Sequence, residues 1–313
     1  MSEAMRAMEG RLAAGEVVLL DGATGTELQR RGAAMSDGAW CALATASHPD
    51  LLCAIHADYI RAGADVITAN TFASARHLLE RAGQGELTVE LLRRAIGLAR
   101  EAVDATAERP VVVAGSISTM RPVGKGTDQR DLDVDLAAIP WADNLREVAD
   151  TLAEAGADLL LLEMISDIDY GMLALEAARD TGLPLWVGLS AKRQDGRLVS
   201  YRDDGPSFRE LADHWTRQPV QAVGIMHTAV PEIDEALDLL LARTDLPVMA
   251  YPEAGYFRSP NWTFVEVGPE GFAEAATGWA GRGARILGGC CGLGPDHIAA
   301  LAGRIRSREC PRR

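Results

Sequence analysis

Short apolar runs alternate with longer amphipathic segments along most of this chain. Eight runs have the length and composition of buried parallel strands. They lie at residues 17–20, 66–69, 111–114, 159–162, 185–189, 222–225, 248–251 and 285–287. The segments between them repeat apolar residues at helical spacing, most clearly at 87–107, 143–155 and 169–180. The pattern predicts alternating strands and helices.

Two of the expected helix-to-strand joints have nearly the same sequence, Ala62-Gly63-Ala64-Asp65 and Ala155-Gly156-Ala157-Asp158. Glycine at such a joint is a typical C-terminal helix stop, so the similarity indicates a repeated αβ unit. Eight units in 313 residues predict an α/β protein with one (β/α)₈ TIM barrel. We predict a single domain over residues 1–313, with a core at about 16–302, a short N-terminal extension and a basic C-terminal tail.

A doubly wound open sheet is the main alternative fold. The segment Asp21-Gly22-Ala23-Thr24-Gly25-Thr26 follows the first strand, where such a fold carries its phosphate-binding loop. It lacks the third glycine at the required spacing, and the second strand ends at Asn70 instead of an acidic residue. The barrel is therefore favoured.

Charge and cysteine content narrow the class of protein. The net charge of −14 argues against a nucleic-acid partner, because phosphate backbones require a basic face. Five irregularly spaced cysteines do not form a disulfide framework. Residues 1–15 lack the apolar core of a signal peptide, and no apolar run reaches the ~20 residues that span a bilayer. We expect a cytoplasmic protein with reduced thiols and no membrane partner.

In such barrels the chemistry lies at the C-terminal ends of the strands. In chain order the residues at or just past these ends are Asp21-Gly22, Asn70-Thr71, Gly115-Ser116, Glu163, Ser190, Met226-His227, Tyr251-Pro252-Glu253 and Gly288-Gly289-Cys290-Cys291. Polar and sulfur-bearing side chains thus gather where the fold places catalysis.

The vicinal pair Cys290-Cys291, flanked by glycines, indicates a metal site. Thiolates and an imidazole are zinc ligands, and a catalytic zinc keeps one position open. His227, after the sixth strand, supplies the third ligand of a predicted Zn²⁺ site at the barrel mouth. We interpret Cys41 and Cys53 as small buried hydrophobes.

We expect no catalytic or metal-binding function for the remaining cysteine and histidines. Cys310 lies in the basic tail and is expected to be exposed. The other histidines fall in or beside expected helices and are interpreted as structural: His48, His56, His77, His214 and His297.

With these residues the chain resembles a known family, the zinc-dependent homocysteine S-methyltransferases. This family includes the betaine– and S-methylmethionine–homocysteine methyltransferases and the homocysteine module of cobalamin-dependent methionine synthase. The matching segments are Leu20-Asp21-Gly22-Ala23-Thr24-Gly25-Thr26-Glu27-Leu28, Trp40, Pro49, His56, Tyr59, Ala62-Gly63-Ala64-Asp65, Asn70-Thr71-Phe72, Gly115-Ser116-Ile117, Leu162-Glu163, Tyr251-Pro252 and Gly288-Gly289-Cys290-Cys291-Gly292. They cover roughly residues 16–302.

The resemblance implies roles for these residues. Cys290 and Cys291 would ligate zinc, together with a third cysteine that the family carries in an Asn-Cys pair after strand six. Asp21 and Glu163 would be catalytic and would hold the amino-acid substrate, since a carboxylate pairs with an α-ammonium group. Substrate binding would also involve Gly22, Ala23, Asn70 and Tyr251, with backbone N–H groups around Gly22 and Ala23 facing the α-carboxylate.

Three departures from the family pattern fall at the expected active-site mouth. Met226-His227 stands for Asn-Cys, Glu253 for the Asn of Tyr-Pro-Asn, and Ser118-Thr119 for the Gly-Pro of Gly-Ser-Ile-Gly-Pro. Exchanging a thiolate for neutral imidazole should make zinc a stronger Lewis acid and the bound substrate thiolate a poorer nucleophile. Such a thiolate favours a donor with a good leaving group, such as the sulfonium S-methylmethionine. Glu253 would suit a cationic donor.

The expected reaction is therefore methyl transfer to a small-molecule thiol, with homocysteine as acceptor and methionine as product. Three alternatives stay open: a zinc hydrolase, a family member that binds without methyl transfer, and one that uses another thiol or a selenol. Against the hydrolase, Asp21-Gly22-Ala23 stands where a His-x-His pair is expected. The sequence does not indicate an oligomeric state, and a homo-oligomer stays open.

Overall fold

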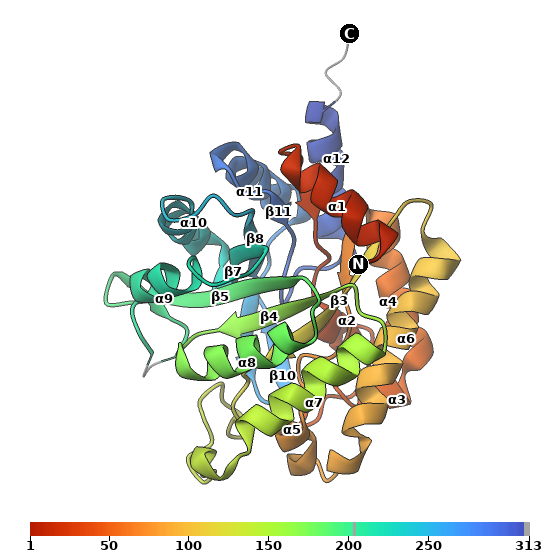
Figure 1. Cartoon of the computed structure of the whole chain (residues 1–313), viewed down its shortest axis with the longest axis vertical. Helices are drawn as coiled ribbons and strands as arrows, with labels where there is room; N and C mark the ends of the chain where they lie inside the picture. Colours follow the sequence, from red (N-terminus) through yellow and green to blue (C-terminus); the bar gives the residue numbers. More distant parts are fainter. Residues whose placement is uncertain (203–204, 310–313) are drawn as a thin grey trace.

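Eight parallel strands form a barrel in the computed structural model of the chain, which describes residues 1–202 and 205–309 (Figure 1). They are β1 (Val18–Leu19), β2 (Val66–Thr68), β3 (Val112–Ser118), β4 (Leu159–Ile165), β5 (Leu185–Gln194), β7 (Ala222–Ala229), β8 (Val248–Glu253) and β11 (Ile286–Leu287). The sheet runs β1-β11-β8-β7-β5-β4-β3-β2, and a parallel bridge between Leu20 and Val66 joins its two edges. Each expected strand is present, and the predicted barrel is confirmed.

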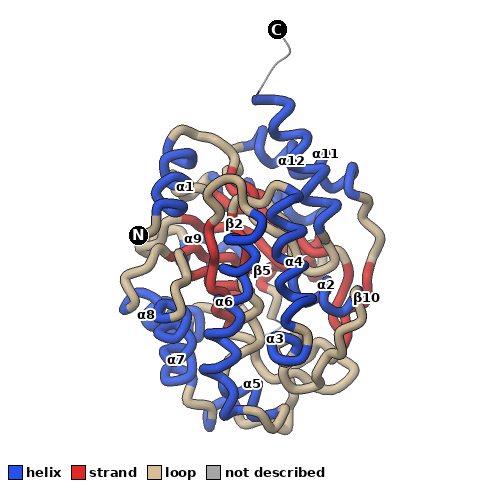
Figure 2. The backbone as a smooth tube through the Cα atoms, turned by 90° about the vertical axis from the view of Figure 1, so that its right-hand side faces the viewer, coloured by secondary structure: helices blue, strands red, loops and turns tan. Residues whose placement is uncertain are grey.

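Helices enclose the strands, as Figure 2 shows. The longer ones are α4 (Pro49–Ala62), α6 (Thr88–Thr106), α7 (Trp141–Glu154), α8 (Asp169–Asp180), α9 (Phe208–Trp215), α10 (Ile233–Leu241), α11 (Pro269–Arg282) and α12 (Pro295–Glu309). Shorter pieces are α2 (Thr24–Arg30), α3 (Ala44–Ser47), α5 (Arg76–Arg81) and the 3₁₀ turns η1 (Gly85–Leu87), η2 (Leu136–Ala138) and η3 (Val230–Glu232). The helices predicted from spacing correspond to α6, α7 and α8. No helix in the described part of the chain is long and apolar enough to cross a membrane.

The two similar joints have the same structure. Their glycines have φ of 112° and 94°, which ends the helix in the left-handed region. The aspartate that follows each one accepts a hydrogen bond from a backbone N–H of the preceding strand: Asp65 from Leu19 at 2.9 Å, and Asp158 from Val113 at 2.8 Å. The repeated sequence therefore fastens each new strand to its neighbour.

An N-terminal helix, α1 (Glu3–Ala13), packs against the barrel interior. Met5 and Met8 are buried among inward-facing residues of the strands, including Val18, Val112 and Trp186. The Ser2 hydroxyl caps this helix by accepting from the Met5 N–H at 3.2 Å. The sequence pattern had not distinguished this helix from an extension.

Two hairpins extend the fold around the active-site end. Strand β5 continues past the barrel and pairs antiparallel with β6 (Arg197–Ser200). After β8, strands β9 (Gly255–Arg258) and β10 (Asn261–Phe264) pair with each other. The loop that follows β3 joins this hairpin through Gly126 N–H to Ser259 O (2.9 Å) and Ser259 N–H to Thr127 O (3.1 Å). These segments build walls above the strand ends.

Candidate active site

A cavity of about 580 Å³ lies at the C-terminal ends of the barrel strands. Residues from seven of the expected strand ends line it: Asp21, Gly22, Ala23, Asn70, Ser116, Glu163, Met226, His227, Tyr251, Cys290 and Cys291. The structure thus brings the sequence-predicted site residues together in one place, although they are up to 270 positions apart along the chain.

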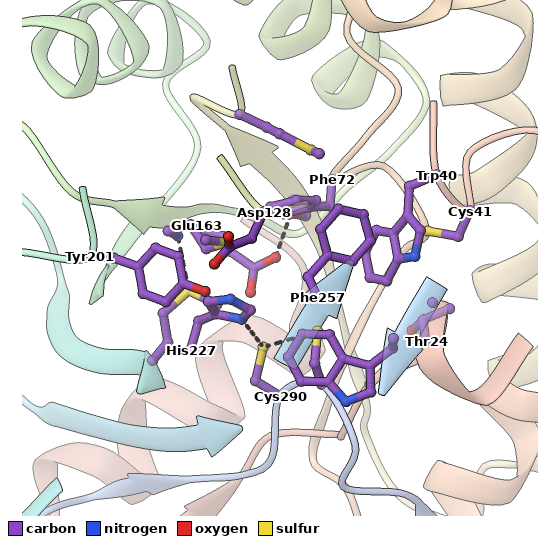
Figure 3. A pocket seen from close by; sticks show the side chains of 18 of the residues that line it. Thr24, Trp40, Cys41, Phe72, Asp128, Glu163, Tyr201, His227, Phe257 and Cys290 are labelled. Atoms are coloured by element: carbon purple, nitrogen blue, oxygen red, sulfur yellow. Dashed lines mark hydrogen bonds between the residues drawn. The ribbon is translucent and has the colours of Figure 1, made fainter. Parts of the chain in front are cut away.

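His227, Cys290 and Cys291 form a compact group of ligand atoms (Figure 3). Cys290 Sγ lies 3.7 Å from His227 Nδ1 and 3.9 Å from Cys291 Sγ. Bonds of about 2.3 Å to sulfur and 2.1 Å to nitrogen in a tetrahedral site place ligand atoms about 3.6–3.8 Å apart. These two distances are close to those expected around one metal ion, and all three ligand atoms lie within 4.8 Å of one another.

The electrostatics of the sulfur pair also favour a cation. The neighbouring Cys291 and burial raise the pKa of Cys290 well above the ordinary range of a thiol. Two adjacent thiolates are costly in a buried site unless a positive charge lies between them. A divalent cation supplies that charge.

A tight backbone holds the cysteine pair against β8 and its continuation. Cys290 N–H donates to Pro252 O at 2.7 Å, and Cys291 O accepts from Ala254 N–H at 2.8 Å. Gly292 follows with φ of 87°, and a Cβ there would lie 2.1 Å from Ala254 O. Only glycine permits this approach, which explains its place after the cysteines.

His227 lies at a bulge where the register between β7 and β8 shifts. Its φ of 42° is uncommon for a residue with a side chain and is found mostly where function requires it. The rings of Tyr201 and Trp262 pack at 4.9 and 5.7 Å from the imidazole. Burial lowers the pKa of His227 to about 3, so the ring is neutral and free to ligate.

Glu253 lies behind this histidine. Its Oε2 is 3.0 Å from His227 Nδ1, and burial raises the pKa of its carboxyl to about 8. Glu253 is not among the described residues that line the cavity, so the expectation that it faces a cationic donor is not supported.

Two buried carboxyl groups also face the cavity, that of Asp21 after β1 and that of Glu163 in β4. Asp21 accepts from the Thr68 N–H at 2.7 Å and from its hydroxyl at 3.0 Å. Glu163 accepts from the Ser116 hydroxyl, with the Tyr251 hydroxyl nearby. Burial raises the pKa of Asp21 well above its usual range and that of Glu163 to about 7, although these hydrogen bonds oppose the rise. A cationic ligand would relieve the cost of ionising them.

Two expected substrate contacts are already engaged within the protein. The Ala23 N–H donates to Leu293 O at 3.1 Å, so the prediction that it faces an α-carboxylate is not supported. The Asn70 amide donates to Cys41 O (3.0 Å) and to the Thr45 hydroxyl (3.1 Å), while its oxygen accepts from the Cys41 thiol. Asn70 therefore stabilises the wall of the cavity.

The outer part of the cavity is aromatic. Trp40 packs edge-on against Phe72 and Phe257, with ring centroids 6.2 and 5.8 Å apart, and Tyr201 and Trp262 complete the lining. Phe257, Trp262 and Tyr201 were not predicted, because they lie in the hairpins and after β6. A cluster of aromatic residues at 256–264, in a chain with only 5% aromatic content, was the available signal.

Most of the cysteines and histidines that we interpreted as structural lie outside the metal-binding group. Cys41 is buried, but Cys53 in α4 is only partly buried, and Cys310 lies outside the described residues. None of the other described histidines lines the cavity; they lie in or beside helices at His48, His56, His77, His214 and His297.

Comparison with known proteins agrees with this geometry. A family model for homocysteine S-methyltransferase matches residues 18–305. Homocysteine S-methyltransferase 4 of Zea mays is 30% identical, over 95% of this chain and 91% of that protein. Selenocysteine Se-methyltransferase of Brassica oleracea var. italica is 31% identical, over 94% and 90%. The metallated form of the homocysteine methyltransferase MmuM from Escherichia coli superposes with a TM-score of 0.74 at 28% identity, covering 96% of this chain and all of that one.

Proposed function

Since this chain belongs to the homocysteine S-methyltransferase family, we propose that it transfers a methyl group from an activated donor to homocysteine and so forms methionine. One observation carries the proposal: a metal-binding triad of His227, Cys290 and Cys291 shares a cavity with the carboxyl groups of Asp21 and Glu163. A thiol-binding centre thus lies beside a site for an ammonium group, as an amino acid with a thiol side chain requires.

The metal is proposed to be Zn²⁺. Two cysteines and a histidine are an accepted catalytic zinc set, and the observed ligand spacing fits it. Bound zinc would lower the pKa of a substrate thiol and supply a thiolate at neutral pH. The neutral His227 leaves the three protein ligands with two negative charges, which keeps the ion strongly electrophilic.

The amino-acid end of homocysteine is proposed to lie between Asp21 and Glu163. Both carboxyl groups are buried and face the cavity, so an α-ammonium group placed there makes charge-assisted hydrogen bonds in a site of low dielectric constant. Ser116 orients Glu163 by donating a hydrogen bond from its hydroxyl group. This anchoring directs the thiol side chain toward Cys290 and Cys291.

The donor is proposed to be a cation, such as the sulfonium S-methylmethionine. The aromatic lining of Trp40, Phe72, Phe257 and Trp262 offers ring faces and edges to the outer cavity, and cations bind aromatic faces favourably. In the reaction the acceptor thiol loses its proton and its sulfur attacks the methyl carbon in line. The bond from that carbon to the donor sulfur breaks, and its electron pair leaves with a neutral thioether.

Parallel assays test this proposal. Purified protein should methylate homocysteine with S-methylmethionine or S-adenosylmethionine, and more slowly with betaine, whose leaving group is poorer. Cys291→Ala should abolish both metal binding and turnover. Absence of turnover with every sulfonium, from protein with its metal bound, would show that the donor proposal is wrong.

A selenol acceptor is the second candidate. Two plant selenocysteine methyltransferases are among the relatives, at 31% and 28% identity. A selenol ionises more readily than a thiol and needs less activation by the metal. Competition between selenocysteine and homocysteine for the same preparation separates the two acceptors.

A further inference from the structure

Asp128 is an acidic residue of the cavity that the acceptor does not use. Among the described residues that line the cavity, the acidic ones are Asp21, Glu163 and Asp128. Asp21 and Glu163 lie at the strand ends and are proposed to hold the amino-acid end of homocysteine. Asp128 comes from the loop between β3 and α7, residues 119–140, and is exposed where that loop lines the outer cavity. The outer cavity therefore has a carboxylate of its own.

The backbone that carries Asp128 is a small turn fastened to the β9–β10 hairpin. Gly124 N–H donates to Gln129 O at 3.0 Å and closes this turn, and Gly126 N–H donates to Ser259 O at 2.9 Å. The Asp128 carboxylate itself accepts from Gln129 Nε2 at 3.0 Å. Asp128 is therefore held at a defined place beside the cavity before a ligand binds.

Aromatic rings lie close to this carboxyl group. Figure 3 shows Asp128, Tyr201 and Phe257 among the side chains that line the cavity. Burial raises the pKa of the Tyr201 hydroxyl, and the charges of Glu253 and Asp128 raise it further, so Asp128 lies near this ring. A carboxylate beside aromatic faces offers a cation two favourable contacts, one with a full negative charge and one with the negative face of a ring.

Asp128 has no positive partner in the described part of the chain. In its own loop Lys125 pairs with Asp37 at 3.3 Å, and no ion pair joins Asp128 to a lysine, arginine or histidine of residues 1–202 and 205–309. The positive side chains that line the cavity are Arg121, Arg130, Lys192 and Arg202. Arg202 pairs with Asp167 in the cavity wall. Positive groups suit the carboxylate of an amino-acid donor, whereas a sulfonium centre needs a negative group.

We propose that Asp128 is the counter-charge of the methyl donor, so that the site selects a sulfonium over a neutral donor. This inference rests on the proposed methyl transfer and adds to it a specificity-determining residue outside the metal triad. In the transfer the acceptor sulfur bonds to the methyl carbon, and the bond from that carbon to the sulfonium sulfur breaks with its electron pair. The donor leaves as a neutral thioether, so its attraction to Asp128 disappears and its release is favoured.

The change of charge predicts which kinetic constant depends on Asp128. The positive charge of the donor is complete in the bound substrate and already diminished in the transition state. Asp128 therefore stabilises the bound donor at least as much as the transition state, and its removal should raise KM for the donor without lowering kcat. A residue that only shapes the loop would change kcat as well, or KM for both substrates.

Asp128→Asn tests this role, because it removes the charge and keeps the shape of the side chain. KM for S-methylmethionine should rise about fivefold or more, kcat should not fall, and KM for homocysteine should stay the same. Asp133→Asn is the matched control, since Asp133 is exposed in the same loop and does not line the cavity. Asp128→Glu keeps the charge and should retain most of the affinity for the donor.

Calorimetric binding of trimethylsulfonium, measured without homocysteine, tests the charge without any turnover. Wild type and Asp133→Asn should bind this cation about fivefold or more tightly than Asp128→Asn does. Equal affinity in wild type and Asp128→Asn, an equal rise in both KM values, or a fall in kcat at unchanged donor KM overturns the role of Asp128. Wild-type protein that transfers no methyl group from any sulfonium overturns the proposed function instead, so the two failures are distinguishable.

Discussion

Replacement of Glu163 by glutamine should stabilise the unliganded protein in a way that grows with pH. Burial raises the pKa of Glu163 from 4.5 to about 7. The folded state therefore favours the protonated form, and ionisation of this carboxyl costs stability once the pH exceeds its unfolded pKa. Glutamine cannot ionise and keeps an oxygen that can accept from the Ser116 hydroxyl.

The magnitude follows from the shift. About 2.5 pKa units correspond to roughly 3 kcal/mol between the two protonation states. Below pH 4.5 Glu163 is protonated in both the folded and the unfolded protein, so its ionisation does not lower the stability of wild type. Between about pH 4.5 and pH 7 the stability of wild type relative to Glu163→Gln declines, and above about pH 7 the difference levels off at about 3 kcal/mol.

Urea denaturation at pH 5, 6, 7 and 8, without metal or thiol, measures this difference. Glu176→Gln in α8 is the control, since Glu176 is exposed and its substitution should give a pH-independent difference. The same Glu163→Gln variant should bind homocysteine more weakly, because it cannot pair with the α-ammonium group. A stability difference that is constant from pH 5 to 8, or that grows toward low pH, would refute the reasoning.

Three further substitutions test other parts of the site. Trp40→Ala should raise KM for a sulfonium donor about fivefold to thirtyfold, the loss of 1–2 kcal/mol of cation–π attraction, with little change in KM for homocysteine; equal changes in both would contradict a donor-specific role. Gly292→Ala places a Cβ 2.1 Å from Ala254 O at φ of 87° and should lower the free energy of unfolding by about 2 kcal/mol or more, which thermal denaturation measures; an unchanged Tm would show that the turn relaxes freely. His227→Cys should retain zinc but change kcat and the preference among donors, and unchanged metal content with unchanged kinetics would exclude His227 as a ligand.

Much of the fold was predictable because buried parallel strands are continuous apolar runs, and this chain shows each of the barrel's eight. The strand ends of a parallel barrel meet at one mouth, so the positions of the strands along the chain were enough to group Cys290, Cys291 and His227. Helix α1 was missed because nothing in its sequence marks Met5 and Met8 as a plug for the barrel interior. The single-domain boundaries and the cytoplasmic location stay predictions, and the oligomeric state stays open.

The finer geometry of the site was not predictable, and one irregularity explains most of the difference. The bulge in β7 shifts the register against β8 between Met226 and Ala229. A sequence pattern does not reveal such a bulge. The bulge interrupts the regular alternation of side chains along β7 and turns His227 and Glu253 toward each other. The substrate contacts expected of Ala23 and Asn70 stay predictions, and the internal hydrogen bonds that these groups make could not be foreseen because they depend on loop conformation.

The central claim is that His227, Cys290 and Cys291 bind a metal that receives the substrate thiol. X-ray absorption at the zinc edge, on purified protein with and without homocysteine, tests it most directly. We predict one zinc per chain with two sulfur and two lighter ligands at rest, and three sulfur and one lighter ligand when homocysteine is bound. Protein without stoichiometric zinc, or a sulfur count that stays at two with homocysteine present, would contradict the account.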